Sequence, residues 1–464
     1  MSGKQAVAAA GAGQRTSLAQ QLGQVARCVQ SVQAGRSLTD VLPTVPSHLR
    51  PGVQALTFHA LRHLGTTSAL VGALTEQAPP PLTHALLCSA LALLAPKAQA
   101  TSDDSAPVYD AFTVVDQAVD AARAQPATAR QAGMVNACLR RYLREAEPLH
   151  TQVEADWAAR YNHPAWWVKR VRRDHPQHWQ AILAASQHSA PLVLRVNVTH
   201  TTRDAYLARL SDDGLSAQAV GLVGVVLTQP VPVEGLPGYA EGWFSVQDTA
   251  AQCAAPLVLD GLNAPTDRPL RVLDACAAPG GKTAHLLEHA HALGVSVDVL
   301  ALEVDARRSA RITENLQRLR LNGTASVKVA DAAQPAAWWD GLPFDAVLLD
   351  APCSASGIVR RHPDVRWLRR ESDVPALVET QRRILDALWP TLAPAGRLVY
   401  CTCSVFKAEG QAQVDSFLSR HTNALACTAP GHLLPGARSD AGGLPDNPSG
   451  EHDGFFYAVL EKVA

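Results

Sequence analysis

The second half of the chain alternates short apolar runs with segments of helical periodicity, and this alternation limits the possible folds more than any other feature. Five runs rich in Val, Leu and Ala and bounded by Gly, Pro or Asp are typical of buried parallel strands. They cover 270–274, 297–303, 326–330, 344–350 and 397–401. The pattern predicts a doubly wound, Rossmann-like α/β sheet, whose ligands bind at the carboxyl ends of the strands.

The rest of the chain differs in character, and 464 residues are too many for one ordinary core. Between about residues 17 and 144 the apolar residues recur at helical spacing, whereas the following stretch mixes a Trp/Arg-rich helical segment (157–179) with strand-like pieces. We therefore predict a multidomain protein. Its parts are a disordered N-terminus (1–16), an all-α domain (17–148), a small α/β connector (149–237) and the α/β domain (238–464).

Composition indicates the cellular compartment of the protein and limits its possible partners. Nine cysteines without disulfide-like or metal-binding spacing indicate a reducing cytoplasm, and no metal site is expected. The sequence has no signal-peptide core and no apolar stretch long enough to span a bilayer, so we expect a cytoplasmic protein with no membrane partner. Because the net charge is only −1, any contact with nucleic acid has to come from local clusters of arginine.

Two cysteines follow two of the predicted strands. Cys353 lies in Asp350-Ala-Pro-Cys-Ser and Cys403 in Thr402-Cys-Ser. Carbon 5 of cytosine is a poor nucleophile until a group adds to carbon 6, and a thiolate serves this purpose. Asp350 is placed to stabilise the charge that develops on the base. The chemistry alone allows either thiol to be the nucleophile.

A second motif follows the first predicted strand and opens a helix, which is typical of a cofactor loop. Its glycines let a ligand approach the backbone, and the free amides of the helix favour an anionic group. A P-loop would need glycine where Cys276 stands, which argues against a nucleoside triphosphate. Acidic residues at strand ends suit ribose hydroxyls and an adenine, so we predict S-adenosylmethionine as the cofactor. The predicted cofactor-binding residues are Cys276, Ala277, Ala278, Pro279, Gly280, Gly281, Lys282, Glu303, Asp331 and Asp350.

The run 344–354 resembles the signature of the NOL1/NOP2/Sun family of RNA cytosine-5 methyltransferases, and 276–282 resembles the cofactor loop of this family. The resemblance extends over nearly the whole chain from about Ser17, and it is closest to the bacterial 16S ribosomal RNA enzymes of the family. Residues 134–140 are similar to the last helix of the NusB-type RNA-binding fold. Further matching segments are 194–197, 242–248, 360–364, 366–370 and 453–458.

The resemblance implies a SAM-dependent methyltransferase domain at 238–464 and a NusB-like RNA-binding domain at 17–148. It implies a monomer that methylates a cytosine of 16S rRNA, of the type at position 967, with Cys403 as the nucleophile and Cys353 assisting product release. DNA cytosine methyltransferases instead take their nucleophile from a Pro-Cys loop after the same strand. The sequence departs from the family pattern in having Glu303 in place of aspartate, Cys401 in place of alanine, and a longer loop at 95–107.

A group of cationic side chains after the Pro-Cys motif is predicted to hold RNA phosphates or to stack a base. The alternative is a solvated loop and helix start. The residues concerned are Arg360, Arg361, His362, Arg366, Arg369 and Arg370. Arginines 123, 130, 140, 141 and 144 remain open between RNA contact and solvated helix faces. Two other functions also remain open: a related enzyme that acts on transfer RNA or another ribosomal cytosine, and an RNA-binding assembly factor with a vestigial catalytic domain.

Overall fold

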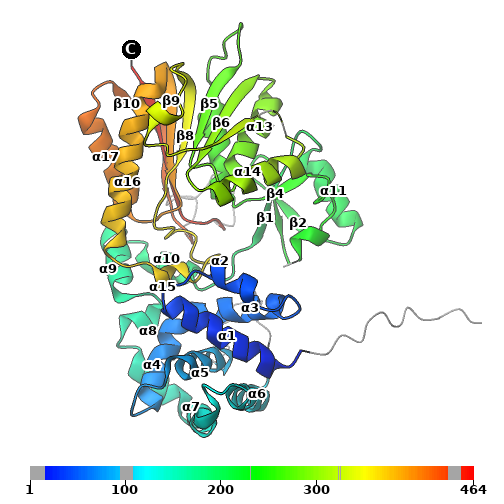
Figure 1. Cartoon of the computed structure of the whole chain (residues 1–464), viewed down its shortest axis with the longest axis vertical. Helices are drawn as coiled ribbons and strands as arrows, with labels where there is room; N and C mark the ends of the chain where they lie inside the picture. The colour runs from blue at the N-terminus through cyan, green and yellow to red at the C-terminus, as the bar shows by residue number, and fades with distance from the viewer. Residues whose placement is uncertain are drawn as a thin grey trace, which may run out of the picture. The chain divides into compact units, whose positions relative to one another are not determined.

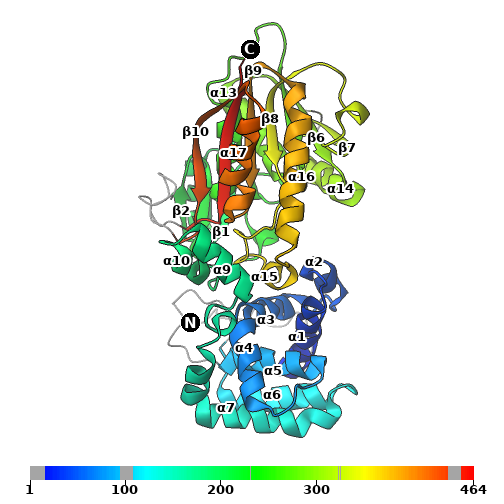
Figure 2. The same cartoon turned by 90° about the vertical axis from the view of Figure 1, so that its left-hand side faces the viewer.

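The computed structural model describes residues 16–94, 108–229, 231–321, 323, 325–436 and 451–463. Nearly all of the expected disordered N-terminus and the whole of the loop at 95–107 lie outside these ranges. The chain forms two compact units, one ending at His163 and the other beginning at Pro164 (Figures 1 and 2). Within the described ranges, no helix is both long and apolar enough to cross a lipid bilayer.

The first unit is all-α, as the periodicity predicts. Ser17 begins its first helix with a capping box, in which its hydroxyl accepts a hydrogen bond from the Gln20 amide while the Gln20 side chain accepts one from the Ser17 amide. The expected domain boundary at residue 148 falls inside the last long helix, and the unit continues to His163. Its helices are α1 (Leu18–Gln33), α2 (Leu38–Val41), α3 (Arg50–Arg62), α4 (Leu64–Leu74), α5 (Pro81–Leu94), α6 (Ala111–Arg123), α7 (Ala132–Val153) and α8 (Trp157–Tyr161).

The second unit begins with two helices and a small antiparallel sheet. The sheet has the strand order β2-β3-β1-β4 and packs its apolar face against Tyr206 and Leu210 of α11. It shares one compact unit with the larger sheet, and its last strand lies beyond the expected connector boundary at residue 237. The elements are α9 (Ala165–Asp174), α10 (Trp179–Ala185), β1 (Leu192–Val196), α11 (Arg203–Asp212), β2 (Ala217–Val220), β3 (Gly224–Leu227) and β4 (Phe244–Val246).

The larger sheet has seven strands in the order β10-β11-β9-β8-β5-β6-β7. The five predicted strands are present and pair in parallel: β5 (Leu270–Ala275), β6 (Val297–Glu303), β7 (Ala325–Val329), β8 (Phe344–Asp350) and β9 (Leu392–Thr402). Two strands that the sequence analysis did not predict, β10 (Ala424–Leu433) and β11 (Phe455–Lys462), complete one edge as an antiparallel pair.

Helices cover both faces of this sheet, so its strands are apolar on both sides (Figures 1 and 2). One face packs against α12 (Ala254–Leu259), α13 (Gly281–Leu293) and α14 (Ala306–Arg318), and the other against α16 (Asp373–Leu388) and α17 (Gln411–Arg420). Side chains alternate between the faces along each strand. Cys401 lies in the α13 layer, Tyr400 lies in the α16 layer, and Cys403 packs on the same side as Cys401. A short helix, α15 (Val365–Leu368), follows β8.

Candidate active site

The structure brings the two predicted cysteines together. Strands β8 and β9 are parallel neighbours with Asp350 opposite Cys401, so the segments that follow them leave the sheet side by side. The Sγ atoms of Cys353 and Cys403 lie 3.4 Å apart, and both side chains are only partly buried. Two thiols at hydrogen-bond distance, open to a ligand, can share one reaction on one substrate.

The environment of the pair acts on the titration of Cys353. The hydrogen bond to Cys403 and burial together raise the pKa of the Cys353 thiol well above its usual value. A raised pKa favours the protonated thiol, which is the less nucleophilic form of cysteine.

Asp350, the last residue of β8, connects this pair to the predicted cofactor loop. Its Oδ2 atom lies 2.7 Å from the Lys282 ammonium, and its Oδ1 atom lies 3.6 Å from the Cys401 thiol. Burial opposes the charge on Lys282, but the Asp350 carboxylate together with the Cys401 and Cys403 thiols raises the pKa of Lys282. The Lys282 ammonium also lies 5.4 Å from the ring centroid of Phe455, within the range of a cation–π contact.

The predicted cofactor loop connects β5 to the start of α13. Gly280 has φ of 95°, and a Cβ atom there would lie 3.0 Å from the Cα atom of Ile312 on α14, so the close packing of loop and helix needs glycine. Cys276 adopts a φ of 63°, which is unusual for a residue with a side chain. Burial raises the pKa of its thiol to about 12, so Cys276 is a neutral part of the loop and no competing nucleophile.

Two acidic residues lie at the carboxyl ends of the next two strands, as the sequence predicts. Glu303 ends β6 with only 2% of its surface exposed, and its Oε1 atom accepts hydrogen bonds from the Asp305 amide and the Arg308 guanidinium. Its Oε2 atom has no hydrogen-bond partner among the described residues, which leaves a buried acceptor for the hydroxyls of a ligand. Asp331, after β7, accepts hydrogen bonds from the Ala333 amide and the Gln334 side chain.

A third acidic residue of this region, Asp274, is fully buried in β5. Its Oδ2 atom accepts a hydrogen bond of 2.6 Å from the Thr283 hydroxyl, which ties the strand to the first turn of α13. Burial raises the pKa of Asp274 to about 7. Asp274 is not among the predicted site residues, because a sequence pattern does not report burial.

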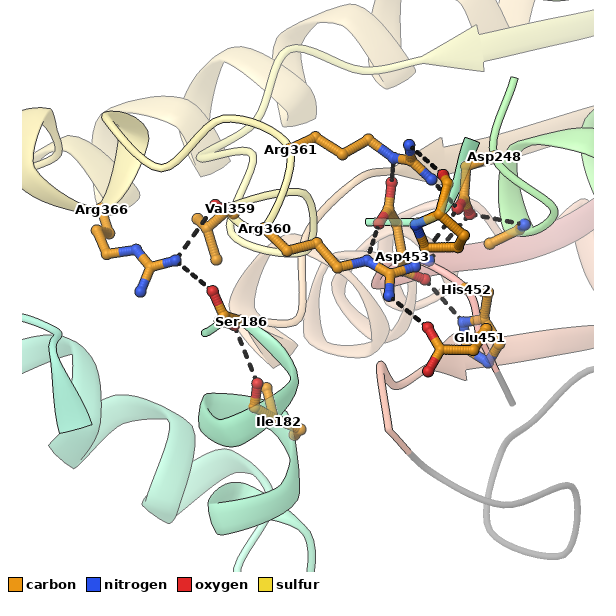
Figure 3. A network of polar contacts seen from close by, with 12 residues as sticks. Ile182, Ser186, Asp248, Val359, Arg360, Arg361, Arg366, Glu451, His452 and Asp453 are labelled. Carbon is orange, nitrogen blue, oxygen red and sulfur yellow. Dashed lines mark hydrogen bonds and ion pairs between the residues drawn. The ribbon is translucent and has the colours of Figure 1, made fainter. Parts of the chain in front are cut away.

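Two members of the expected RNA-binding cluster, Arg360 and Arg361, form ion pairs within the protein. Figure 3 shows both guanidinium groups turned into the protein, where they flank the buried carboxylates of Asp248 and Asp453. Arg361 lies 2.8 Å from Asp248, and Arg360 lies 2.9 Å from Glu451. Both arginines also form ion pairs with Asp453. These charges are paired within the protein, which favours a structural role for the two arginines, and RNA contact stays a prediction for them.

Arg366, a third member of the expected cluster, also contacts the interior of the protein. It is fully buried and donates to the backbone carbonyls of Ser186 and Val359, at 2.7 and 3.2 Å (Figure 3). Arg369 donates to the carbonyls of Cys353 and Ser354, so it supports the loop that carries the first thiol. His362 and Arg370 are exposed, and RNA contact remains a prediction for them.

A buried ion pair that sequence reasoning missed connects the small sheet to the cofactor loop. Arg195 of β1 donates to both carboxylate oxygens of Glu288 on α13, at 2.8 and 2.9 Å, and to the carbonyl oxygen of Gly281. Both charged side chains are inaccessible to solvent, and a buried pair of this kind holds its two elements in one fixed arrangement. The small sheet therefore helps to fix the position of the cofactor loop.

Among the residues that the structure describes, no three or more His, Cys, Asp or Glu side chains are grouped so as to hold a metal ion.

Comparison with known proteins shows that the chain is similar to RNA methyltransferases. Residues 262–461 match the family model described as 16S rRNA methyltransferase RsmB/F, and residues 163–234 match the ferredoxin-like domain of RsmF/B-like methyltransferases. The fold resembles the crystal structure of PH0851, with a TM-score of 0.71 at 21% identity over 95% of this chain and 99% of that one. It also resembles NSun6 from Pyrococcus horikoshii, with a TM-score of 0.53 at 18% identity over 65% and 98% of the two chains.

Curated relatives identify the family more closely. The chain is 40% identical to ribosomal RNA small subunit methyltransferase B of Vibrio cholerae over 93% of this chain and 95% of that protein. It is 46% identical to the protein of the same name from Pseudomonas putida over 72% and 74% of the two chains. The chain belongs to the ribosomal RNA small subunit methyltransferase B family.

Proposed function

We propose that this protein transfers a methyl group from S-adenosylmethionine to carbon 5 of a cytosine in 16S ribosomal RNA, through a covalent bond between Cys403 and carbon 6. The observation that carries the proposal is the pair of thiols 3.4 Å apart at the ends of β8 and β9, next to Asp350. The names of the curated relatives support ribosomal RNA as the substrate.

The cofactor is assigned to the loop 276–282 together with Glu303 and Asp331. The unpartnered Oε2 atom of Glu303 suits the ribose hydroxyls of the cofactor. The first turn of α13 offers free backbone amides to the carboxylate of the cofactor. The related NSun6 structure was determined with SFG, an analogue of S-adenosylmethionine, which supports the same choice. When bound, the cofactor supplies an electrophilic methyl group on a sulfonium.

The residues of the chain perform the remaining steps. The Cys403 thiolate forms a bond to carbon 6 of the base, and the electron pair of the 5,6 double bond moves to make carbon 5 nucleophilic. After carbon 5 has taken the methyl group, a base removes its proton, the 5,6 double bond reforms and the carbon–sulfur bond breaks. Cys353 is in position to assist this elimination, because its sulfur lies beside the sulfur that leaves.

Asp350 and Lys282 provide the charges near the base. We assign the Asp350 carboxylate to the exocyclic amine of the cytosine, where it holds the ring against Cys403. The Lys282 ammonium forms an ion pair with Asp350 at 2.7 Å and places a positive charge near the thiols.

The all-α unit is proposed to be a NusB-like RNA-binding domain. The support is the resemblance of residues 134–140 to the last helix of that fold, together with exposed arginines on α7, among them Arg140, Arg141 and Arg144. A ribosomal substrate places the reaction in the cytoplasm. We further propose that the target is of the type at position 967 and that the enzyme acts as a monomer.

Bisulfite sequencing of ribosomal and transfer RNA from a deletion strain tests the proposal. Loss of one 5-methylcytosine in 16S RNA, restored by the wild-type gene but not by a Cys403→Ala gene, is the expected result. Loss of a transfer RNA methylation instead would assign the related activity. Unchanged methylation of both RNAs, together with a ribosome assembly defect that the Cys403→Ala gene repairs, would support the assembly factor.

A further inference from the structure

One buried carboxylate joins the two loops that carry the thiols. Glu409 lies six residues after Cys403, in the short 3-10 turn Lys407–Glu409, and no part of it is exposed. We propose that Glu409 is a positioning residue that sets the distance between the Cys353 and Cys403 sulfurs by binding the serine that follows each cysteine. The effect of Glu409 on catalysis rests on the proposed function, whereas its effect on the distance between the two sulfurs does not.

The two carboxylate oxygens divide their hydrogen bonds between the loops. Oε1 accepts from the backbone amide of Ser354 at 2.8 Å, and Oε2 accepts from the Ser404 hydroxyl at 2.6 Å. The Ser354 hydroxyl also donates to Oε2. Because Ser354 follows Cys353 and Ser404 follows Cys403, any movement of this carboxylate is passed to both sulfurs through one residue of chain.

The carboxylate itself has little freedom to move. Gln381 of α16 donates to Oε1 at 3.2 Å, and the backbone carbonyl of Glu409 accepts hydrogen bonds from the Tyr400 and Thr402 hydroxyls. These contacts fix Glu409 to a helix and to β9, which are rigid elements of the second unit. A group that must hold two others in register is best placed on such elements.

Hydrogen bonds also join the two loops directly. The Ala351 amide donates to the Cys401 carbonyl, and the Gly357 amide donates to the Cys403 carbonyl, both at 2.9 Å. The Ser404 hydroxyl lies 3.3 Å from the Ser354 hydroxyl and 2.8 Å from the Ser356 hydroxyl. Glu409 is the charged acceptor of this network, and its carboxylate binds Ser354 and Ser404 at the same time.

Oxidation of the thiol pair measures the geometry without any need for methyl transfer. Diamide removes two electrons and two protons from a pair of thiols, forming one disulfide while its N=N bond is reduced to a hydrazine. The rate of Cys353–Cys403 disulfide formation, read by mass spectrometry of the full-length protein, depends on how often the sulfurs meet. We compare wild type with Glu409→Ala and with Glu409→Gln, which has the same shape and keeps an acceptor for the Ser354 amide.

Thr391→Val is the matched control. It removes a buried hydrogen bond from the Thr391 hydroxyl to the Leu388 carbonyl at the start of β9, the end of the strand opposite to Cys403. It therefore destabilises the same sheet without touching the thiol loops. Melting temperatures of all variants are measured so that rates are compared at temperatures where each variant is folded.

The expected order of disulfide formation is wild type, then Glu409→Gln, then Glu409→Ala, with Thr391→Val equal to wild type. Single-turnover methylation of 16S RNA should follow the same order, with a loss of about 100-fold in Glu409→Ala, because a displacement of about 1 Å has this effect on a positioned reaction. Affinities for cofactor and RNA should not change. Rates in both Glu409 variants equal to those of Thr391→Val would overturn the inference.

Two further outcomes are separable. If the wild-type protein does not methylate cytosine but the order of disulfide rates holds, the proposed function is wrong and the positioning role of Glu409 stands. If Glu409→Ala does not fold, Glu409→Gln and Ser404→Ala decide: a disulfide rate equal to wild type in both contradicts the positioning role. A slowed rate in Glu409→Gln supports it, because Ser404→Ala also removes the direct contacts of Ser404 with Ser354 and Ser356.

Discussion

The Sγ atoms of Cys353 and Cys403 lie 3.4 Å apart, although the two residues follow different strands, β8 and β9. The hydrogen bond to Cys403 and burial raise the pKa of the Cys353 thiol. Under the proposed function the two thiols have different tasks: Cys403 attacks carbon 6, and Cys353 assists the later elimination.

Removing each thiol in turn should therefore have opposite effects on the covalent complex. Cys403→Ala should neither methylate 16S RNA nor form an adduct, because the carbon–sulfur bond is never made. Cys353→Ala should attack and accept the methyl group but stall at elimination, so that a protein–RNA species accumulates and survives denaturing electrophoresis. Cys427→Ala, which changes a partly buried thiol on β10, is the control and should behave as wild type. An adduct trapped by Cys403→Ala would exchange the two assignments.

Glu303 should contribute to cofactor affinity. Its Oε2 atom is buried without a partner, so a bound ribose can complete its hydrogen bonds. Glu303→Ala should weaken binding of S-adenosylmethionine by on the order of 1.5–3 kcal/mol, the usual range for hydrogen bonds to a charged group. Calorimetry of the full chain measures this loss, with Glu314→Ala on the exposed side of α14 as a control for charge. Equal affinities in the two variants would remove Glu303 from the site.

Much of the catalytic centre could be predicted from sequence because its geometry is a consequence of strand direction. Short apolar runs between helices indicate parallel strands, and parallel strands place the residues that follow them at one edge of the sheet. Cys353, Cys403 and Asp331 follow predicted strands and Glu303 ends one, and the structure places each of them at or after the end of the expected strand. The positions required no knowledge of side-chain contacts.

The contacts themselves could not be predicted, since they join residues that are far apart in the chain. An arginine has the same appearance in a sequence whether it faces RNA or a buried carboxylate, and Arg360 lies 93 positions from its partner Asp453. The bridge from Glu409 to Ser354 spans 55 positions, and β11, which was not predicted, supplies Phe455 beside Lys282. Tertiary packing determines which of these distant residues come into contact, and a local sequence pattern does not show this.

The arginine network should act on stability rather than on RNA binding. Arg360 is 4% exposed and pairs with Asp453 and Glu451, so Arg360→Ala leaves buried negative charge with fewer partners. Urea unfolding should show a loss of about 3 kcal/mol, the lower end for breaking a buried pair. The salt dependence of RNA binding, which reports phosphate contacts, should not change.

The exposed Arg370 provides the matched comparison, because its removal leaves every buried charge paired. Arg370→Ala should keep the unfolding free energy within about 0.5 kcal/mol of wild type. If it contacts RNA, the salt slope of binding decreases. A stable Arg360→Ala protein with a decreased salt slope would restore the RNA-phosphate interpretation for that residue.

Asp274 should make the stability of the protein depend on pH. Burial raises its pKa in the folded protein to about 7, against an ordinary value of 3.8. Between these two values the folded state holds a proton that the unfolded chain has lost, so stability falls as pH rises until the folded group ionises. The slope is about 1.36 kcal/mol per pH unit, which amounts to about 2 kcal/mol between pH 5.5 and pH 7.

Asp274→Asn keeps an acceptor for the Thr283 hydroxyl but cannot ionise, so this part of the pH dependence should disappear. Urea unfolding from pH 5.5 to pH 8 measures the difference between the two proteins, and Asp298→Asn, at an exposed position of β6, should follow wild type. Parallel curves for wild type and Asp274→Asn would mean that Asp274 is already ionised in the folded protein at pH 5.5. In that case a buried negative charge lies next to the cofactor loop at neutral pH, and Lys282 has to balance Asp274 as well as Asp350.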